Sequence, residues 1–214
     1  MFIPQFGSEF AEGWVESDET TFLLPKIASE VAVPIALPRT ELVLRAAKIR
    51  LLLLDVDGVL TDGSIAYSDD GAEIKRFHVR DGSGLKFWQE NGNRVAILSG
   101  RTSVAVERRA NELGIDTVLQ GRSDKRPAWD ELLVRTGCRP EEVCSIGDDL
   151  ADVPILLRSG LAVAVADACD EVCDVAHYVT AKPGGHGAGR EAIEWLMGLQ
   201  GRWADVVLRH RRTD

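Results

Sequence analysis

The fold of this chain is decided by the stretch Leu51-Leu52-Leu53-Leu54-Asp55-Val56-Asp57-Gly58. Four consecutive leucines make an apolar run of strand length, which is typical of a strand buried in a parallel sheet. The run ends at two carboxylates, and open α/β sheets bind their ligands at the carboxyl ends of the strands. Neighbouring carboxylates beside apolar walls are unfavourable unless a cation or a shared proton offsets their charge. Because carboxylate oxygens suit Mg²⁺, the stretch predicts a metal site at the end of a central strand.

Strand-like and helix-like segments alternate along most of the chain after this stretch. The patterns predict strands over 94–98, 117–119, 143–146 and 161–165, and helices over 40–48, 102–113, 125–135 and directly after Leu150. This alternation predicts an α/β fold of three layers, a Rossmann-like parallel sheet with helices on both faces. One segment breaks the alternation. Strand-like residues 64–67 and 72–79 flank an Asp70-Gly71 turn, which predicts a β-hairpin insertion after the first strand.

Length, composition and charge limit the class of protein. The 214 residues are 45% hydrophobic and 28% charged, as expected of a globular protein with one main domain. A net charge of −9 argues against partners such as nucleic acid or an anionic membrane surface. The acidic N-terminus does not resemble a secretory signal, and the four cysteines lack metal-ligand spacing, so we expect a cytoplasmic enzyme. The domain prediction is an irregular extension over 1–38, a catalytic domain over 39–200 and a basic tail over 201–214.

Further polar groups follow the later strands. Ser99-Gly100-Arg101 offers a hydroxyl, a backbone N–H and a guanidinium to a phosphate, and Lys125 opens a predicted helix. Gly147-Asp148-Asp149-Leu150-Ala151-Asp152 adds three carboxylates that could complete a magnesium site with Asp55. Each feature alone has an ordinary explanation, such as a solvated lysine or acids that favour a helix start. Together, and in this order along the chain, these features form a specific pattern.

The motifs resemble those of the haloacid dehalogenase superfamily of phosphatases. Phe77-His78-Val79-Arg80-Asp81-Gly82 and Val163-Ala164-Val165-Ala166-Asp167-Ala168 are similar to one branch, the 3-deoxy-D-manno-octulosonate 8-phosphate phosphatases. The resemblance covers about residues 40 to 199. It implies a magnesium-dependent phosphatase of a sugar-acid phosphate that works through an aspartyl-phosphate. The chain between Asp55 and Lys125 is too short for the cap domain of many relatives, so we expect a capless fold.

The resemblance also implies roles for individual residues. Asp55 would be the nucleophile and Asp57 the general acid and base, while Lys125 and Ser99 would bind the phosphoryl oxygens. The metal would be held by Asp55, the Asp57 carbonyl and Asp148, with Asp149 and Asp152 orienting these groups. The substrate-binding set comprises His78, Val79, Arg80, Asp81, Gly82, Gly100, Arg101, Arg109, Lys125 and His186. His186 departs from the family, which often has a longer basic residue at this position.

Members of this branch are tetramers whose hairpins associate and whose C-terminal tails reach adjacent active sites, so the resemblance implies a homotetramer. Two other functions remain open at this stage. One is hydrolysis of a nonulosonate 9-phosphate, such as that of KDN or sialic acid, and the other is a non-catalytic tetramerisation module. Intact Asp55, Asp57, Lys125 and Asp148 argue against the module. A phosphoacceptor receiver domain is disfavoured because receivers lack a second aspartate equivalent to Asp57.

Overall fold

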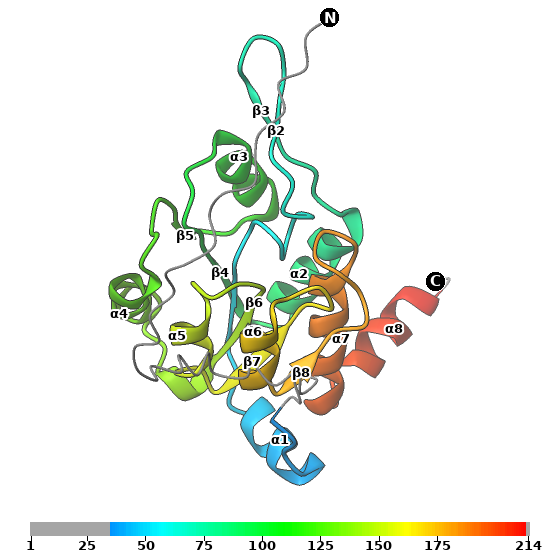
Figure 1. The fold of residues 1–214 in the computed structure, drawn as a ribbon. Helices are drawn as coiled ribbons and strands as arrows, with labels where there is room; N and C mark the ends of the chain where they lie inside the picture. The colour runs from blue at the N-terminus through cyan, green and yellow to red at the C-terminus, as the bar shows by residue number, and fades with distance from the viewer. Residues whose placement is uncertain (1–34, 213–214) are drawn as a thin grey trace, which may run out of the picture. The chain divides into compact units, whose positions relative to one another are not determined.

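The computed structural model describes residues 35–212, and its centre is a six-stranded parallel sheet (Figure 1). The strands lie in the order β5-β4-β1-β6-β7-β8. Their bounds are β1 Leu51–Leu54, β4 Arg94–Leu98, β5 Thr117–Leu119, β6 Val143–Gly147, β7 Leu161–Ala164 and β8 Tyr178–Val179. Each neighbouring pair is parallel, and β1 lies between β4 and β6. The predicted Rossmann-like sheet is thus confirmed, with the leucine run at its centre.

Helices cover both faces of the sheet. One layer contains α1 (Arg39–Ala46), α2 (Val79–Glu90), α3 (Val104–Leu113), α7 (Ala188–Leu199) and α8 (Trp203–Arg211). The other contains α4 (Lys125–Thr136), α5 (Val153–Leu156) and α6 (Asp170–Val175). Because side chains alternate along a strand, Leu52 and Leu54 pack into the first core while Leu51 and Leu53 pack into the second. Burial on both faces explains why all four residues of β1 are apolar.

Helix α2 corrects the prediction, which extended a strand to Val79 and assigned no helix after it. Gly82 and Gly84 concealed the helix, because glycine normally disfavours a helix interior. Packing favours glycine at both positions, most clearly at Gly84, where the Arg190 backbone lies 3.3 Å from the Cβ position. A Cβ on Gly82 would lie 2.2 Å from a guanidinium nitrogen of Arg109, and one on Gly84 would lie 2.9 Å from Arg190 Cδ on α7. Tertiary contact therefore overrides the local propensity.

The hairpin insertion is present but shorter than predicted. Its strands are β2 (Ala66–Tyr67) and β3 (Glu73–Ile74), paired antiparallel. Gly71 takes a positive φ of 83° in the turn, and the Ser68 N–H donates to the Ala72 carbonyl. The chain between β1 and β4 contains this hairpin and α2, which agrees with a capless fold. Figure 1 shows the hairpin projecting beyond the end of the sheet at which β1 terminates.

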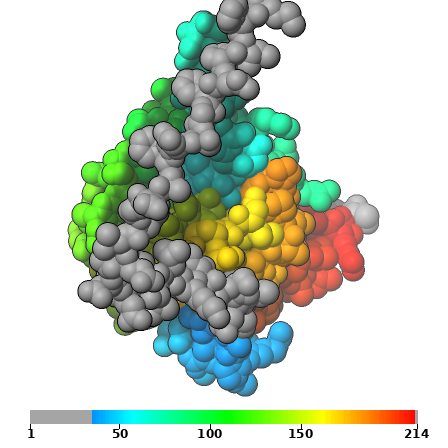
Figure 2. All heavy atoms as spheres, in the orientation of Figure 1, coloured from blue at the N-terminus to red at the C-terminus, as the bar shows by residue number. Residues whose placement is uncertain are grey.

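The two predicted end segments have different outcomes. Most of the predicted extension, residues 1–34, lies outside the described residues. The 201–214 segment, predicted as a basic tail, contains helix α8. This helix packs on the domain: Val206 is buried, and the ring centroids of Trp203 and Phe87 are 6.2 Å apart. Figure 2 shows α7 and α8, in orange and red, side by side. Among residues 35–212, no helix is long and apolar enough to cross a membrane.

Candidate active site

The predicted catalytic residues meet in one open pocket of about 170 Å³ at the carboxyl ends of β1, β4 and β6. Each belongs to a loop or helix that directly follows a strand, as in other open α/β sheets. The lining residues are Asp55, Asp57, Ser99, Gly100, Arg101, Lys125, Asp148, Asp149, Ala151 and Asp152. The sheet thus brings together residues that are up to 97 positions apart in the chain, between Asp55 and Asp152.

Lys125 lies between two buried carboxylates. Its Nζ is 2.5 Å from Asp55 Oδ1 and 2.5 Å from Asp152 Oδ1. Lys125 is the first residue of α4, and the preceding Asp124 caps this helix by accepting the Arg126 N–H. Burial opposes the charge of Lys125, but Asp55 and Asp152 outweigh it and raise its pKa. The amine is therefore a fixed cation at the base of the pocket.

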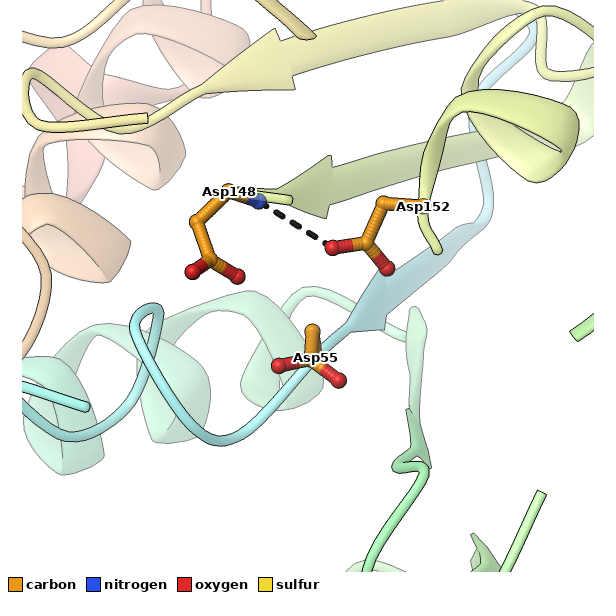
Figure 3. Close-up of side chains that lie close together, drawn as sticks. All are labelled: Asp55, Asp148 and Asp152. Carbon is orange, nitrogen blue, oxygen red and sulfur yellow. Dashed lines mark hydrogen bonds between the residues drawn. The ribbon is translucent and has the colours of Figure 1, made fainter. Parts of the chain in front are cut away.

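Three carboxylates cluster closely at the pocket. Oxygens of Asp55, Asp148 and Asp152 lie within 4.8 Å of one another, and Figure 3 shows Asp55 and Asp148 facing a common space. Burial raises the pKa of Asp55 to about 7 against the opposing charge of Lys125. Burial, followed by the charge of Asp55, raises the pKa of Asp148 to about 8. Because such carboxylates lack enough positive charge around them, a divalent cation fits this donor set.

Asp152 differs from the other two carboxylates because both of its oxygens are already engaged. Oδ1 pairs with Lys125, while Oδ2 accepts from the backbone N–H of Asp148 at 3.1 Å and of Asp149 at 3.4 Å. These contacts fix the loop that carries Asp148. They favour the predicted orienting role of Asp152 over direct coordination of a metal.

Two glycines allow the carboxylates to approach the strand ends. Gly58 has a φ of 95°, and a Cβ there would lie 2.0 Å from Asp148 Oδ2. A Cβ on Gly147 would lie 2.5 Å from Asp152 Cβ. The glycines of the Asp-x-Asp-Gly and Gly-Asp-Asp motifs are therefore steric requirements of this site.

The Asp57 carboxylate contacts a second lysine, Lys75, which the sequence did not predict as a site residue. Its Oδ1 forms an ion pair with Lys75 of the hairpin, and its Oδ2 lies 3.7 Å from Arg101 Nε. Glu73 of β3 also contacts both cations, at 3.6 Å from Lys75 Nζ and 3.0 Å from an Arg101 nitrogen. A lysine in a predicted exposed hairpin carries no local signal of such a contact, and only the tertiary fold reveals it.

Ser99 follows β4 with its side chain buried, and its Oγ accepts the Arg101 N–H at 3.3 Å. Its own N–H donates to the Leu119 carbonyl, so the turn is fixed to β5. The hydroxyl and the following Gly100 line the pocket beside Lys125. This arrangement agrees with the predicted phosphate-binding turn, whose role in binding stays a prediction.

The remaining predicted substrate-binding residues lie outside this pocket. His78, Val79, Arg80, Asp81 and Gly82 surround the start of α2, and Arg109 of α3 approaches Gly82. Asp81 has a structural contact, since its Oδ1 accepts the Arg190 N–H in the first turn of α7 at 2.7 Å. His186 Nδ1 lies 2.8 Å from the Gly184 carbonyl oxygen within a glycine-rich loop, residues 182–187. That loop packs on the 58–62 segment of the same chain, where Gly185 donates to the Val59 carbonyl.

Comparisons with known proteins agree with this geometry. The model of the haloacid dehalogenase-like hydrolase family matches residues 117–190. The 3-deoxy-D-manno-octulosonate 8-phosphate phosphatase KdsC of Yersinia pestis is 48% identical over 157 residues, which cover 73% of this chain and 84% of that protein. The Escherichia coli K12 protein of the same name is 44% identical over 162 residues, covering 76% and 86%.

Solved structures show the same similarity. The phosphatase of this name from Moraxella catarrhalis, in complex with a magnesium ion, a phosphate ion and a KDO molecule, superposes with a TM-score of 0.78. It is 37% identical, and the match covers 80% of this chain and 99% of that one. A probable YrbI family phosphatase from Pseudomonas syringae also gives a TM-score of 0.78, with 42% identity and coverage of 82% and 99%.

Proposed function

Since this chain belongs to the 3-deoxy-D-manno-octulosonate 8-phosphate phosphatases of the haloacid dehalogenase-like hydrolases, we propose that it hydrolyses this sugar-acid phosphate in a magnesium-dependent reaction. The observation that carries the proposal is the single pocket in which Asp55, Asp57, Lys125 and Asp148 meet. These groups are what transfer of a phosphoryl group to a carboxylate requires. The KDO, phosphate and magnesium bound by the Moraxella catarrhalis neighbour support the same ligands here.

In the proposed reaction, Asp55 attacks phosphorus and becomes an aspartyl-phosphate while Asp57 protonates the leaving sugar oxygen. Asp57 then accepts a proton from the water that hydrolyses this intermediate. Lys125 and Ser99 stabilise the phosphoryl oxygens. Asp55, the Asp57 carbonyl and Asp148 would hold the magnesium ion, which supplies positive charge against the anionic nucleophile and phosphate.

A direct test is phosphate release from a panel of purified substrates, with magnesium and with chelator. The panel contains the octulosonate 8-phosphate, two nonulosonate 9-phosphates and ordinary hexose phosphates. We expect selective release from the octulosonate that is lost in chelator and in Asp55→Asn. The control is Asp116→Asn, an exposed aspartate far along the chain, which should keep full activity. Equal activity of Asp55→Asn and the unmodified protein would contradict the mechanism. Preference for a nonulosonate 9-phosphate would contradict the proposed substrate but not the reaction.

We also propose that the active form is a homotetramer. The pocket of about 170 Å³ is smaller than most small-molecule sites, which span roughly 300–1,000 Å³. It accommodates the phosphoryl group, so the sugar acid must extend toward other surfaces, among them the residues around the start of α2. Ile65, Tyr67 and Ile74 of the hairpin segment expose more than half of their surface and provide an apolar face for a second copy.

Light scattering tests the assembly. The unmodified chain should give the mass of four copies, and Ile65→Asp should give smaller species because it places a charge on the apolar hairpin face. Leu157→Asp is a matched control, since Leu157 is similarly exposed on a different element. A monomeric unmodified protein with full activity would contradict the proposal.

A further inference from the structure

Each of the two predicted catalytic aspartates has a buried lysine of its own. Lys125 contacts Asp55, and Lys75 contacts Asp57. The Lys75 side chain is only 2% exposed, although Lys75 directly follows β3 of the short hairpin, most of whose strand residues are exposed. A lysine amine is strongly hydrated, so its burial requires specific compensation. Glu73 and the ionised Asp57 provide that compensation, and Glu73 continues to provide it when Asp57 is protonated.

The contacts fix the direction of the Asp57 carboxylate. Oδ1 faces Lys75 and Oδ2 faces Arg101, while Glu73 contacts both of these cations. Asp57 thus belongs to a network formed by the hairpin and by the turn after β4. Its backbone follows β1, but its side chain is held by residues of two other segments, Lys75 after β3 and Arg101 after β4.

Placement of this carboxylate matters for the chemistry of the first step. A bond forms between an Asp55 oxygen and phosphorus, the bond from phosphorus to the sugar oxygen breaks, and the proton of Asp57 passes to that oxygen. Proton transfer requires hydrogen-bond distance, so a side chain that turns away cannot act as the acid. The residue that sets the Asp57 rotamer therefore influences the rate through Asp57, although it does not line the pocket itself.

From this geometry we propose that Lys75 is a positioning residue that directs the Asp57 carboxylate toward the leaving-group oxygen. The inference rests on the proposed phosphatase function. It assigns to the hairpin a role in the chemistry of its own chain, in addition to any role in assembly. Because the acid is needed only for a poor leaving group, Lys75 should matter for alkyl phosphates and be dispensable for an aryl phosphate whose leaving group is stable as an anion.

The experiment compares kcat/KM for the sugar-acid phosphate and for p-nitrophenyl phosphate, because kcat/KM reports steps up to the first irreversible transfer. Lys75→Met should lower the value for the sugar-acid phosphate by about 10- to 100-fold. It should change the value for p-nitrophenyl phosphate by less than about threefold. Arg76→Met, which removes an exposed charge from the next residue, is the matched control and should leave both values unchanged.

A double-mutant cycle separates positioning from a purely structural role. Once Asp57→Asn has removed the acid, adding Lys75→Met should lower the sugar-acid phosphate value no further. Light scattering on each variant shows whether assembly is intact. If Lys75→Met does not fold, Lys75→Arg retains the charge with altered geometry, and its loss should also be confined to the sugar-acid phosphate.

The outcomes are distinct. Equal losses for both substrates, no loss for either, or additive losses in the cycle would each overturn the role of Lys75. An unmodified protein that releases phosphate from neither substrate would instead refute the proposed phosphatase function, whatever the variants do.

Discussion

Replacing Lys125 by methionine should destabilise the metal-free protein strongly. The change keeps the length and apolar character of the stem but removes the cation that both Asp55 and Asp152 contact at 2.5 Å. Side-chain exposures are 3% for Lys125, 9% for Asp55 and 2% for Asp152, so water cannot replace the lost charge. Two carboxylates would remain buried and mutually repulsive.

The magnitude follows from the burial. Removing one partner of a buried ion pair costs about 3–5 kcal/mol, because the other charge remains uncompensated. Whole domains have unfolding free energies of about 5–15 kcal/mol, so the variant should fold but with much of its stability lost. For a domain of this size each kcal/mol corresponds to about 2–4 °C, which gives a fall in Tm of about 6–20 °C.

The assay is thermal unfolding in chelator and again with saturating magnesium. Magnesium should restore part of the loss, because a cation at Asp55 and Asp148 offsets the same negative charge and ligand binding stabilises the folded state. Lys86→Met is the control, since Lys86 is an exposed lysine of α2 and its loss should change stability by at most about 0.5 kcal/mol. A Lys125→Met variant as stable in chelator as the Lys86→Met control would refute the reasoning.

Three further predictions concern groups outside the metal site. Asp81→Ala should cost about 1–2 kcal/mol in urea unfolding, because Asp81 accepts a backbone N–H in the first turn of α7. Gly184→Ala should weaken magnesium-dependent activity, since its Cβ would lie 1.7 Å from the Gly58 carbonyl oxygen and displace that loop; unchanged activity would contradict this packing. Burial, followed by the charge of Arg45, lowers the pKa of His177 below 6.5, so the unfolded chain binds a proton more readily and stability falls as pH drops below about 6.5. His177→Gln should flatten that acid-side decline, measured as the urea midpoint at pH 5.5 and 7.5.

The sheet could be predicted because its signals are local. The leucine run of β1, residues 95–98 of β4 and the whole of β7 are continuous apolar segments buried on both faces, so no polar residue obscures them. Helix α2 could not be predicted in the same way. Gly82 and Gly84 leave space for the side chains of Arg109 and Arg190, which lie on elements distant in sequence. Local patterns therefore give no sign of the helix that forms here.

The same distinction applies to the site. The motifs that supply Asp55, Ser99, Lys125 and Asp148 each follow a strand, so topology alone predicts that they meet, and the pocket contains all four. The residues grouped around the start of α2 follow no strand of the central sheet. Their position beside the glycine-rich loop depends on how α2 packs on α7, which the sequence does not encode locally.

The two lysines of the pocket show what separates a predictable site residue from a hidden one. Lys125 begins α4, where the helix dipole disfavours a cation, and this conflict within a few residues of sequence already indicates a nearby anion. Lys75 lies in a hairpin where a lysine causes no conflict, since charged residues commonly protect exposed strands. Its burial becomes unusual only once the hairpin is placed against the end of β1. A residue whose function depends on the meeting of two separate elements is therefore invisible to local patterns. For Lys75, the evidence must come from experiment, namely from how its replacement changes the dependence of kcat/KM on the leaving group.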